Sequence, residues 1–132
     1  MSTAIESALQ AKTITPSLTV DDLQASIGFF ESLGFAVEER WEDKGKLNGV
    51  MLLAGNARIG LSQDDWKKGR DRKKGLGTRI FIETAQDIDK LAARAKQSGV
   101  RLSAEPHDTE WGTRAFEVTE PSGFLLTIGS ME

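Results

Sequence analysis

The order strand–helix–strand–strand–strand occurs twice along this chain of 132 residues, and this internal repeat constrains the fold more than any single motif. Each copy begins with a strand-like run, continues with a helix-like run and closes with three further strand-like runs. The repeat predicts a single domain at 13–132, built from two units at about 13–64 and 76–129 that are joined by a charged linker at 65–75. The opening runs are TITPSLTV and VDDLQASIGFFESLGF in the first unit, and GTRIFIET and AQDIDKLAARAKQSGV in the second.

Residue types around the helix-like runs predict where the two helices begin and end. Asp21 is placed to cap the first helix, with a glutamine three residues later in the capping-box position. Thr84 or Asp87 would cap the second helix. Gly34 and Gly99 stand where a helix commonly ends in a residue of left-handed conformation. Both helices are therefore expected to have defined ends.

The composition is that of a soluble globular protein, with 39% hydrophobic residues, 28% charged residues and a net charge of -3. This mild acidity argues against nucleic acid as a partner, because phosphate binding favours a basic face. No apolar run approaches the roughly 20 residues needed to span a membrane. The N-terminal segment 1–12, expected to be a helix or a tether, lacks the features of a secretory signal. We therefore expect a cytoplasmic protein with neither nucleic acid nor membrane as partner.

The chain contains no cysteine and a single histidine, His107. The lack of cysteine excludes a disulfide framework, a thiolate metal site and a cysteine nucleophile. One histidine also excludes the paired-histidine zinc motifs within one chain. Any catalysis would have to use other residue types or this one imidazole.

Two stretches, SLTVDDLQASIGFFESLGF near the start and EWGTRAFEVTEPSGFLLTI at the end, resemble the vicinal oxygen chelate superfamily of glyoxalases, bleomycin resistance proteins and extradiol dioxygenases. The turn EPSG resembles the Asp-Pro-Asp-Gly-Asn turn of that superfamily. The resemblance extends from about Ile14 to the end of the chain. It implies an α+β fold in which two tandem βαβββ modules form a curled mixed sheet around a cup. It implies little about the reaction, because this scaffold carries many chemistries.

The resemblance also implies a divalent metal in the cup, held by the first and last strand of each module. Strand alternation places Thr15, Gly60, Arg79 and Thr127 at those four positions, or Pro16 in place of Thr15 if the register slips by one. Glycine offers no side chain, and arginine is a fixed cation that would repel a metal. We therefore predict a cup without metal or cofactor.

A concave cavity with apolar walls and a few polar groups suits a small organic ligand. Arg79 could pair with a carboxylate or phosphate of the ligand, or with Glu83 or another carboxylate across the cup. Trp41 and Trp111 could stack on a planar ligand, as the resemblance implies, or pack in the core or at its rim. The predicted ligand-binding residues are Thr15, Ser17, Trp41, Ser62, Arg79, Phe81, Glu83, Trp111 and Thr127.

Three functions follow from these features. The first is a binding protein of the drug-sequestration type. The second is a lyase, isomerase or dioxygenase-like enzyme that uses non-standard metal ligands or acid–base groups such as Glu83 and His107, although a lone histidine in an acidic loop is more commonly a surface residue. The third is a module that acts through protein contacts and fills the cup with its own side chains.

Three further expectations concern the assembly and the connecting segments. Family resemblance implies a homodimer, on whose partner Ile5 and Leu9 could dock. The linker 65–75 is either solvated or a lid in which Trp66 is the packing anchor. Arg114 is expected to hydrogen-bond the backbone of the neighbouring turn.

Overall fold

The computed structural model describes residues 8–130, and each half of the chain folds as β-α-β-β-β. The α+β fold class with two βαβββ modules is thereby confirmed. The first module comprises β1 (Ser17–Val20), α1 (Leu23–Ser32), β2 (Ala36–Asp43), β3 (Lys46–Ala54) and β4 (Ala57–Gln63). The second comprises β5 (Arg79–Thr84), α2 (Ile88–Gln97), β6 (Leu102–Asp108), β7 (Arg114–Thr119) and β8 (Leu125–Ser130).

Each module contributes its own four-stranded mixed sheet. The first sheet has the order β1-β4-β3-β2 and the second the order β5-β8-β7-β6. In both sheets the opening strand pairs in parallel with the last strand of the module, and the other pairs are antiparallel. Among the described residues the two sheets are separate and do not close on each other, so the expected curled sheet is divided into two.

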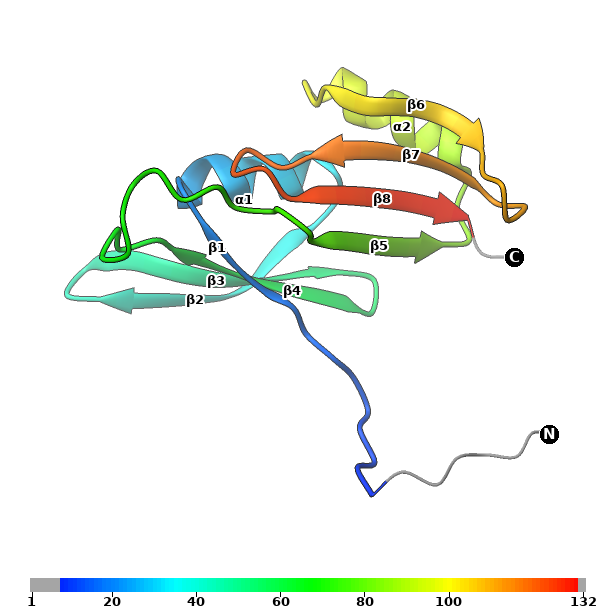
Figure 1. Ribbon diagram of the computed structural model, residues 1–132. Helices are drawn as coiled ribbons and strands as arrows, with labels where there is room; N and C mark the ends of the chain where they lie inside the picture. Colours follow the sequence, from blue (N-terminus) through cyan, green and yellow to red (C-terminus); the bar gives the residue numbers. More distant parts are fainter. Residues whose placement is uncertain (1–7, 131–132) are drawn as a thin grey trace.

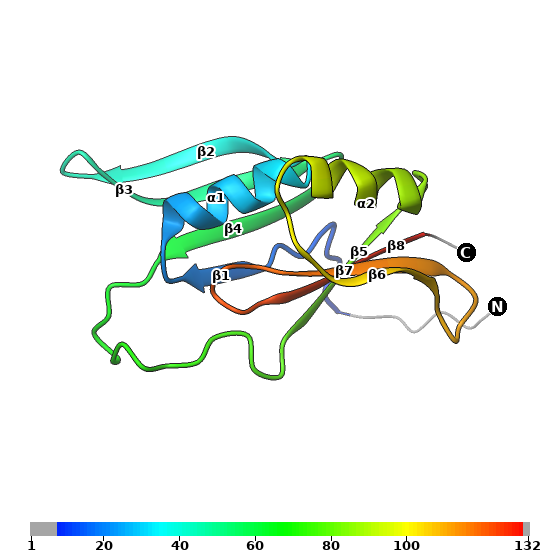
Figure 2. The ribbon, with the colours of Figure 1, turned by 90° about the horizontal axis from the view of Figure 1, so that it is seen from above.

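Each helix packs against one face of its own sheet. Figure 1 shows the second sheet face-on with α2 behind it, and Figure 2 shows α1 lying over the first sheet. Strand alternation explains this layering: Leu18 and Val20 are buried while Ser17 and Thr19 are exposed. The helix-free face of each sheet, called its outer face below, is therefore turned away from the core. Buried side chains from both modules form one cluster, which includes Val20, Ile27, Phe30, Leu52, Leu61, Ala92, Phe116, Val118, Leu126 and Ile128.

The helix ends follow the sequence signals with one correction. Asp22, not Asp21, caps α1, and its carboxylate accepts a hydrogen bond of 3.2 Å from the backbone N–H of Ala25. Asp21 instead forms an ion pair with Lys74 of the linker, an interaction that local spacing cannot reveal. Asp87 caps α2, and the φ angles of +108° at Gly34 and +94° at Gly99 confirm both glycine-marked ends.

Of the two alternatives for the N-terminal segment, a helix or a tether, the described part does not support the helix. Residues 8–12 carry no helix, and Ile5 lies outside the described residues. β1 begins only at Ser17, so the chain before it runs as the extended arm seen in Figure 1. Neither helix of the described segment is long and apolar enough to cross a membrane.

The linker is fastened to the first module by a buried carboxylate. Asp64 accepts hydrogen bonds from the backbone N–H of Trp66 at 2.9 Å and from Arg72 at 2.5 Å, and it forms an ion pair of 2.8 Å with Lys74. The Lys74 ammonium and the Arg70 guanidinium lie 4.7 and 4.9 Å from the centroid of the Trp66 ring. Trp66 is therefore a packing anchor within the linker itself, and Arg70, Arg72 and Lys74 of this charged segment are held by these contacts.

This clamp makes stability depend on acid pH. Hydrogen bonds from Lys74, from the backbone of Trp66 and from Arg72 hold the pKa of the Asp64 carboxyl well below its usual range. Because the folded-state pKa is depressed, this stabilisation is present above the unfolded pKa of about 4 and is lost as the pH falls towards the folded value. We expect the melting temperature to fall below about pH 4, and Asp64→Asn to lower it at neutral pH and flatten its acid decline. Asp65→Asn, at an exposed neighbour, should leave the wild-type profile unchanged.

The β7–β8 turn, Glu120–Gly123, joins the second module to the first. The Ser26 hydroxyl of α1 donates a hydrogen bond to the Glu120 carboxylate, which is 1% exposed and also accepts from the backbone N–H of Ser122 at 2.5 Å. The backbone N–H of Asp21 donates to the Ser122 hydroxyl at 2.8 Å. The turn therefore supplies polar contacts at an otherwise apolar junction.

Candidate functional site

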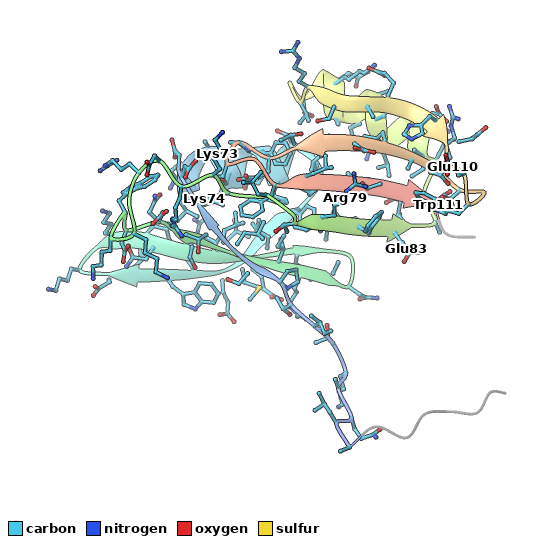
Figure 3. The ribbon with its side chains drawn as sticks, in the orientation of Figure 1. Lys73, Lys74, Arg79, Glu83, Glu110 and Trp111 are labelled. Atoms are coloured by element: carbon cyan, nitrogen blue, oxygen red, sulfur yellow. The ribbon has the colours of Figure 1, made fainter. Side chains whose placement is uncertain are left out.

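The outer face of the second sheet carries most of the exposed aromatic surface of the second module. Along β5, Arg79, Phe81 and Glu83 are exposed, whereas Ile80 and Ile82 are half-buried towards the core. Phe81 is 58% exposed and Trp111, from the loop between β6 and β7, is 59% exposed. Figure 3 shows Arg79, Glu83 and Trp111 on the side of this sheet turned away from both helices.

A hollow of about 690 Å³ lies on this face, and we call it the outer hollow. Its volume falls within the range of small-molecule sites. No linker residue lines it, so the linker is not seen as a lid over it in the described structure. It is lined by Phe81, Ile82, Glu83, Trp111, Thr113, Ala115, Thr127, Gly129 and Ser130.

The strand register explains why the sheet is hollowed here. Glu83 pairs with Gly129, and Gly129 pairs with Ala115 across β7. Gly129 and Ala115 have little or no side chain, so they leave a depression in the sheet surface beside the larger side chains of Phe81 and Trp111. The alternation that assigns Thr127 to the outer face also assigns Gly129, two residues later, to that face, and with it the pairing partner Ala115. This row is not among the residues predicted from the sequence, because small residues carry no chemistry of their own.

Thr127 lies in the next row of the same face, between Phe81 and Glu117. It is 6% exposed, and its Oγ1 has no hydrogen-bond partner, which holds for no other buried side-chain oxygen or nitrogen of the described residues. An unsatisfied buried hydroxyl costs about 1–3 kcal/mol. Such an atom, in a residue that lines a hollow together with exposed rings, is a natural hydrogen-bonding position for a bound molecule.

Arg79 and Glu83 do not pair with each other or with any other charged side chain among residues 8–130. The alternative of an ion pair across the cup within one chain is therefore wrong. One residue separates Phe81 from each of the two charged residues, and four steps along the strand place the Cα atoms of Arg79 and Glu83 about 13 Å apart. Both charges remain available to a ligand.

Ser17, Trp41 and Ser62 lie on the outer face of the first sheet, and Thr15 precedes β1. Ser17 pairs with Gly60, and Ser62 pairs with Gly49, over which the ring of Trp41 lies. A Cβ added at Gly49 would be 3.1 Å from a carbon of that ring, so glycine allows the indole to lie flat on the strand. The structure thus divides the predicted site. Phe81, Glu83, Trp111 and Thr127 line one hollow, and Arg79 is on the same face. Ser17, Trp41 and Ser62 are on the other sheet, and Thr15 lies in the arm before it.

The four positions that would hold a metal in the family are divided in the same way. Thr15 precedes β1 and is exposed, Gly60 lies in β4, and Arg79 and Thr127 lie on the second sheet. A hydroxyl, a residue without a side chain and a fixed cation do not form a donor set for a divalent ion. In the part of the chain that the structure describes, no three His, Asp or Glu side chains gather where they could hold one.

Two other candidates have positions away from the outer hollow. His107 is exposed on β6, and its Nδ1 lies 2.8 Å from the backbone oxygen of Glu105. The sequence predicts that Arg114 hydrogen-bonds the backbone of the neighbouring turn, and this prediction is wrong. The side chain instead makes a bidentate pair with Asp89 at 2.8 and 2.9 Å and a further bond of 3.0 Å to Asp108. Hydrogen bonds from Arg114 hold the pKa of Asp89 below its usual range, so this arginine fastens α2 to the β6–β7 hairpin.

A larger hollow, of about 780 Å³, lies between the modules on the helix side. Its floor is formed by core side chains such as Phe35 and Phe116, and Arg94 lies at its rim. It contains neither exposed aromatic rings nor an unsatisfied buried polar atom. The outer hollow is therefore the better candidate site although it is smaller.

Comparisons with known proteins agree with this fold. The family model of the Glyoxalase/Bleomycin resistance protein/Dioxygenase superfamily matches residues 11–128. No curated protein matches the chain. A superfamily member from Sphaerobacter thermophilus is 20% identical, with a TM-score of 0.72 over 92% of this chain and 98% of that one.

Two further solved structures are similar. The hypothetical protein SA1046 from S. aureus is 17% identical, with a TM-score of 0.71 over 92% of this chain and 95% of that one. A bleomycin-binding protein complexed with bleomycin is 20% identical, with a TM-score of 0.68 over 92% of this chain and all, 100%, of that one. At these identities the likeness shows the fold alone.

Proposed function

This chain belongs to the Glyoxalase/Bleomycin resistance protein/Dioxygenase superfamily, and we propose that it binds a small organic molecule at the outer hollow, without a metal held in the family manner. The proposal is of the drug-sequestration type. Support comes from a bleomycin-binding protein that shares the fold. The substitutions at Thr15, Gly60, Arg79 and Thr127 support the metal-free part, because they remove the donors that a divalent ion requires.

The single observation that carries the proposal is the unpartnered hydroxyl of Thr127. Thr127 is the strand-pairing neighbour of exposed Phe81 and lines, together with Trp111, a hollow of ligand size. A planar ligand could stack on the rings, which are large and rigid contact surfaces. A small movement of the side chains that cover it would let the Thr127 hydroxyl bond a polar atom of that ligand.

Replacing Thr127 by valine tests this role, because the change should raise the stability of the free protein but weaken ligand binding. Without ligand, Thr127→Val should stabilise the protein by about 1 kcal/mol, since a methyl group replaces an unsatisfied hydroxyl. That corresponds to a rise in melting temperature of roughly 3–5 °C for a chain of this size. Compounds that stabilise the wild type in a thermal-shift screen of planar aromatic molecules should bind this variant about fivefold more weakly.

Thr119→Val is the matched control for that experiment. Thr119 lies on the same strand ladder, but its Oγ1 is 2.6 Å from the Ser103 hydroxyl. Its replacement should therefore lower stability slightly and leave ligand affinity unchanged. A destabilised Thr127→Val variant with unchanged affinity would contradict the proposed role. Divalent metals in the same screen should produce no shift, whereas a shift lost on Glu83→Gln would favour the enzyme alternative, for which this unpartnered carboxylate is the candidate acid or base.

We further propose that the protein is a cytoplasmic homodimer in which the outer face of the first sheet of one copy covers the outer hollow of its partner. Trp41 on one outer face and Trp111 on the other leave large aromatic surfaces uncovered in the single chain. The arm before β1 exposes Leu9 and Ile14 as well. Sedimentation equilibrium should give twice the chain mass, and Ile14→Asp should shift the balance towards monomer. A monomer at all accessible concentrations would exclude this arrangement.

A further inference from the structure

The lining of the outer hollow carries one charged group, a carboxylate. Glu83 is the only charged side chain among its lining residues in the described structure. Its carboxylate has no ion pair or hydrogen bond to another side chain in residues 8–130. Some surface carboxylates of this protein are engaged, such as Glu38 by Arg58, Asp89 by Arg114 and Glu105 by Lys96, whereas Glu83 is not. A ligand group that meets Glu83 would therefore gain most if it were cationic.

The aromatic side chains of the hollow favour the same charge. Phe81 and Trp111 present exposed rings to the space that Glu83 borders. The face of an aromatic ring attracts a cation, and tryptophan does so most strongly. An ammonium or similar group placed between the indole and the carboxylate would be stabilised by both.

A positively charged side chain, that of Arg79, lies on the same face of β5, at the start of the strand. Arg79 is exposed on β5, four residues before Glu83, so that its Cα is about 13 Å away along the strand. It too lacks a carboxylate partner in the described residues. Its pairing partner Leu125 is uncharged, as is Thr119, which pairs with Leu125 on the next strand. Between the two charges lie the ring of Phe81 and the hydroxyl of Thr127.

We propose that the ligand of this site is a bipolar aromatic molecule, whose cationic end lies at Glu83 beside Trp111 and whose anionic end lies at Arg79. This inference rests on the proposed binding function and adds to it a ligand class and an orientation. The ring system spans Phe81, and its length is that of an extended molecule of two or three rings rather than of one. A guanidinium is suited to a carboxylate or a phosphate at the anionic end.

Four rigid probes separate orientation from simple aromatic binding. They share a biphenyl core: 4′-(aminomethyl)biphenyl-4-carboxylic acid carries both charges, 4-(aminomethyl)biphenyl carries the cation, biphenyl-4-carboxylic acid carries the anion, and biphenyl-4-methanol carries neither. Isothermal titration calorimetry with the full chain should show the bipolar probe binding about tenfold more tightly than the neutral one, with the singly charged probes between them.

Variants then assign each charge to its partner. Glu83→Gln should abolish the advantage of the aminomethyl group and leave that of the carboxylate. Arg79→Gln should do the reverse. Glu31→Gln and Arg101→Gln, at exposed positions outside the hollow, should change neither. Each comparison uses two probes on one variant, so an unfolded variant would be recognised by the loss of all binding.

The outcomes distinguish this inference from the function on which it rests. Equal affinity for all four probes, still lost in Trp111→Ala, would refute the bipolar orientation and keep the binding function. A preference that responds to neither Glu83→Gln nor Arg79→Gln would refute it as well. If these substitutions instead weaken self-association, the two charges serve the partner copy and the inference fails. Absence of binding by every probe and by every compound of the thermal-shift screen would count against both.

Discussion

Replacing Gly75 by alanine is expected to lower the free energy of unfolding by about 3 kcal/mol, and the melting temperature by roughly 10 °C. A Cβ at this position would lie 2.3 Å from the backbone oxygen of Gly123 and 2.6 Å from its carbonyl carbon. Real Cβ atoms do not approach backbone so closely, so the linker or the β7–β8 turn would have to move. Gly75 also has a φ of +81°, which costs an L-residue about 1 kcal/mol more.

Gly77 provides the matched control in the same loop. Its φ is +72°, but no atom lies within 4 Å of a Cβ added there. Gly77→Ala should therefore show only the backbone cost of about 1 kcal/mol. Chemical denaturation of the three proteins would give the difference between the variants, which measures the close approach alone. Equal losses for the two variants would mean that the linker does not press against the turn.

The close approach of Gly75 to Gly123 shows that the β7–β8 turn is a docking point for the linker, a role that the sequence of the turn does not predict. The run EPSG predicts a turn correctly, because proline and glycine have the conformations that such a turn needs. Nothing in the run predicts that α1 and the linker both dock on it. Those contacts join residues about 50 to 100 positions apart in the chain, and local patterns carry no information at that range.

Period-two alternation accounts for the part of the site that could be predicted. It assigned Phe81, Glu83 and Thr127 to the helix-free side of their strands, and the burial of Ile82 and Ile128 agrees. Alternation states on which side of a strand a residue lies, but not how two modules are packed. The sequence therefore could not show that Trp41 and Trp111 belong to two different outer faces within one chain.

The two errors of detail have the same origin in tertiary contacts. Asp21 and Asp22 are adjacent carboxylates, and either has the local character of a helix cap. Lys74 of the linker forms an ion pair with Asp21, and Asp22 caps α1. Arg114 is bound by Asp89 on α2 rather than by its own turn. In each case a distant charge decides between options that are locally equivalent.

Glu120→Ala is expected to cost about 3 kcal/mol, because it removes the acceptor shared by the two modules. Without the carboxylate, the Ser26 hydroxyl and the backbone N–H of Ser122 would remain buried and unpaired, at about 1–3 kcal/mol each in the worst case. The space left by the shortened side chain adds a cavity cost. Glu120→Gln keeps the shape and one acceptor oxygen, so it should lose less.

A double-mutant cycle with Ser26→Ala isolates the contact across the junction. Hydrogen bonds to charged groups contribute about 1.5–3 kcal/mol, so the coupling between Glu120 and Ser26 should exceed 1 kcal/mol in denaturant unfolding. A coupling near zero would show that Glu120 only shapes its own turn through the N–H of Ser122. The cycle also tests whether the modules unfold together, since a junction held by this bond should give one cooperative transition in the wild type and a broader one, with a lower m-value, in the double variant.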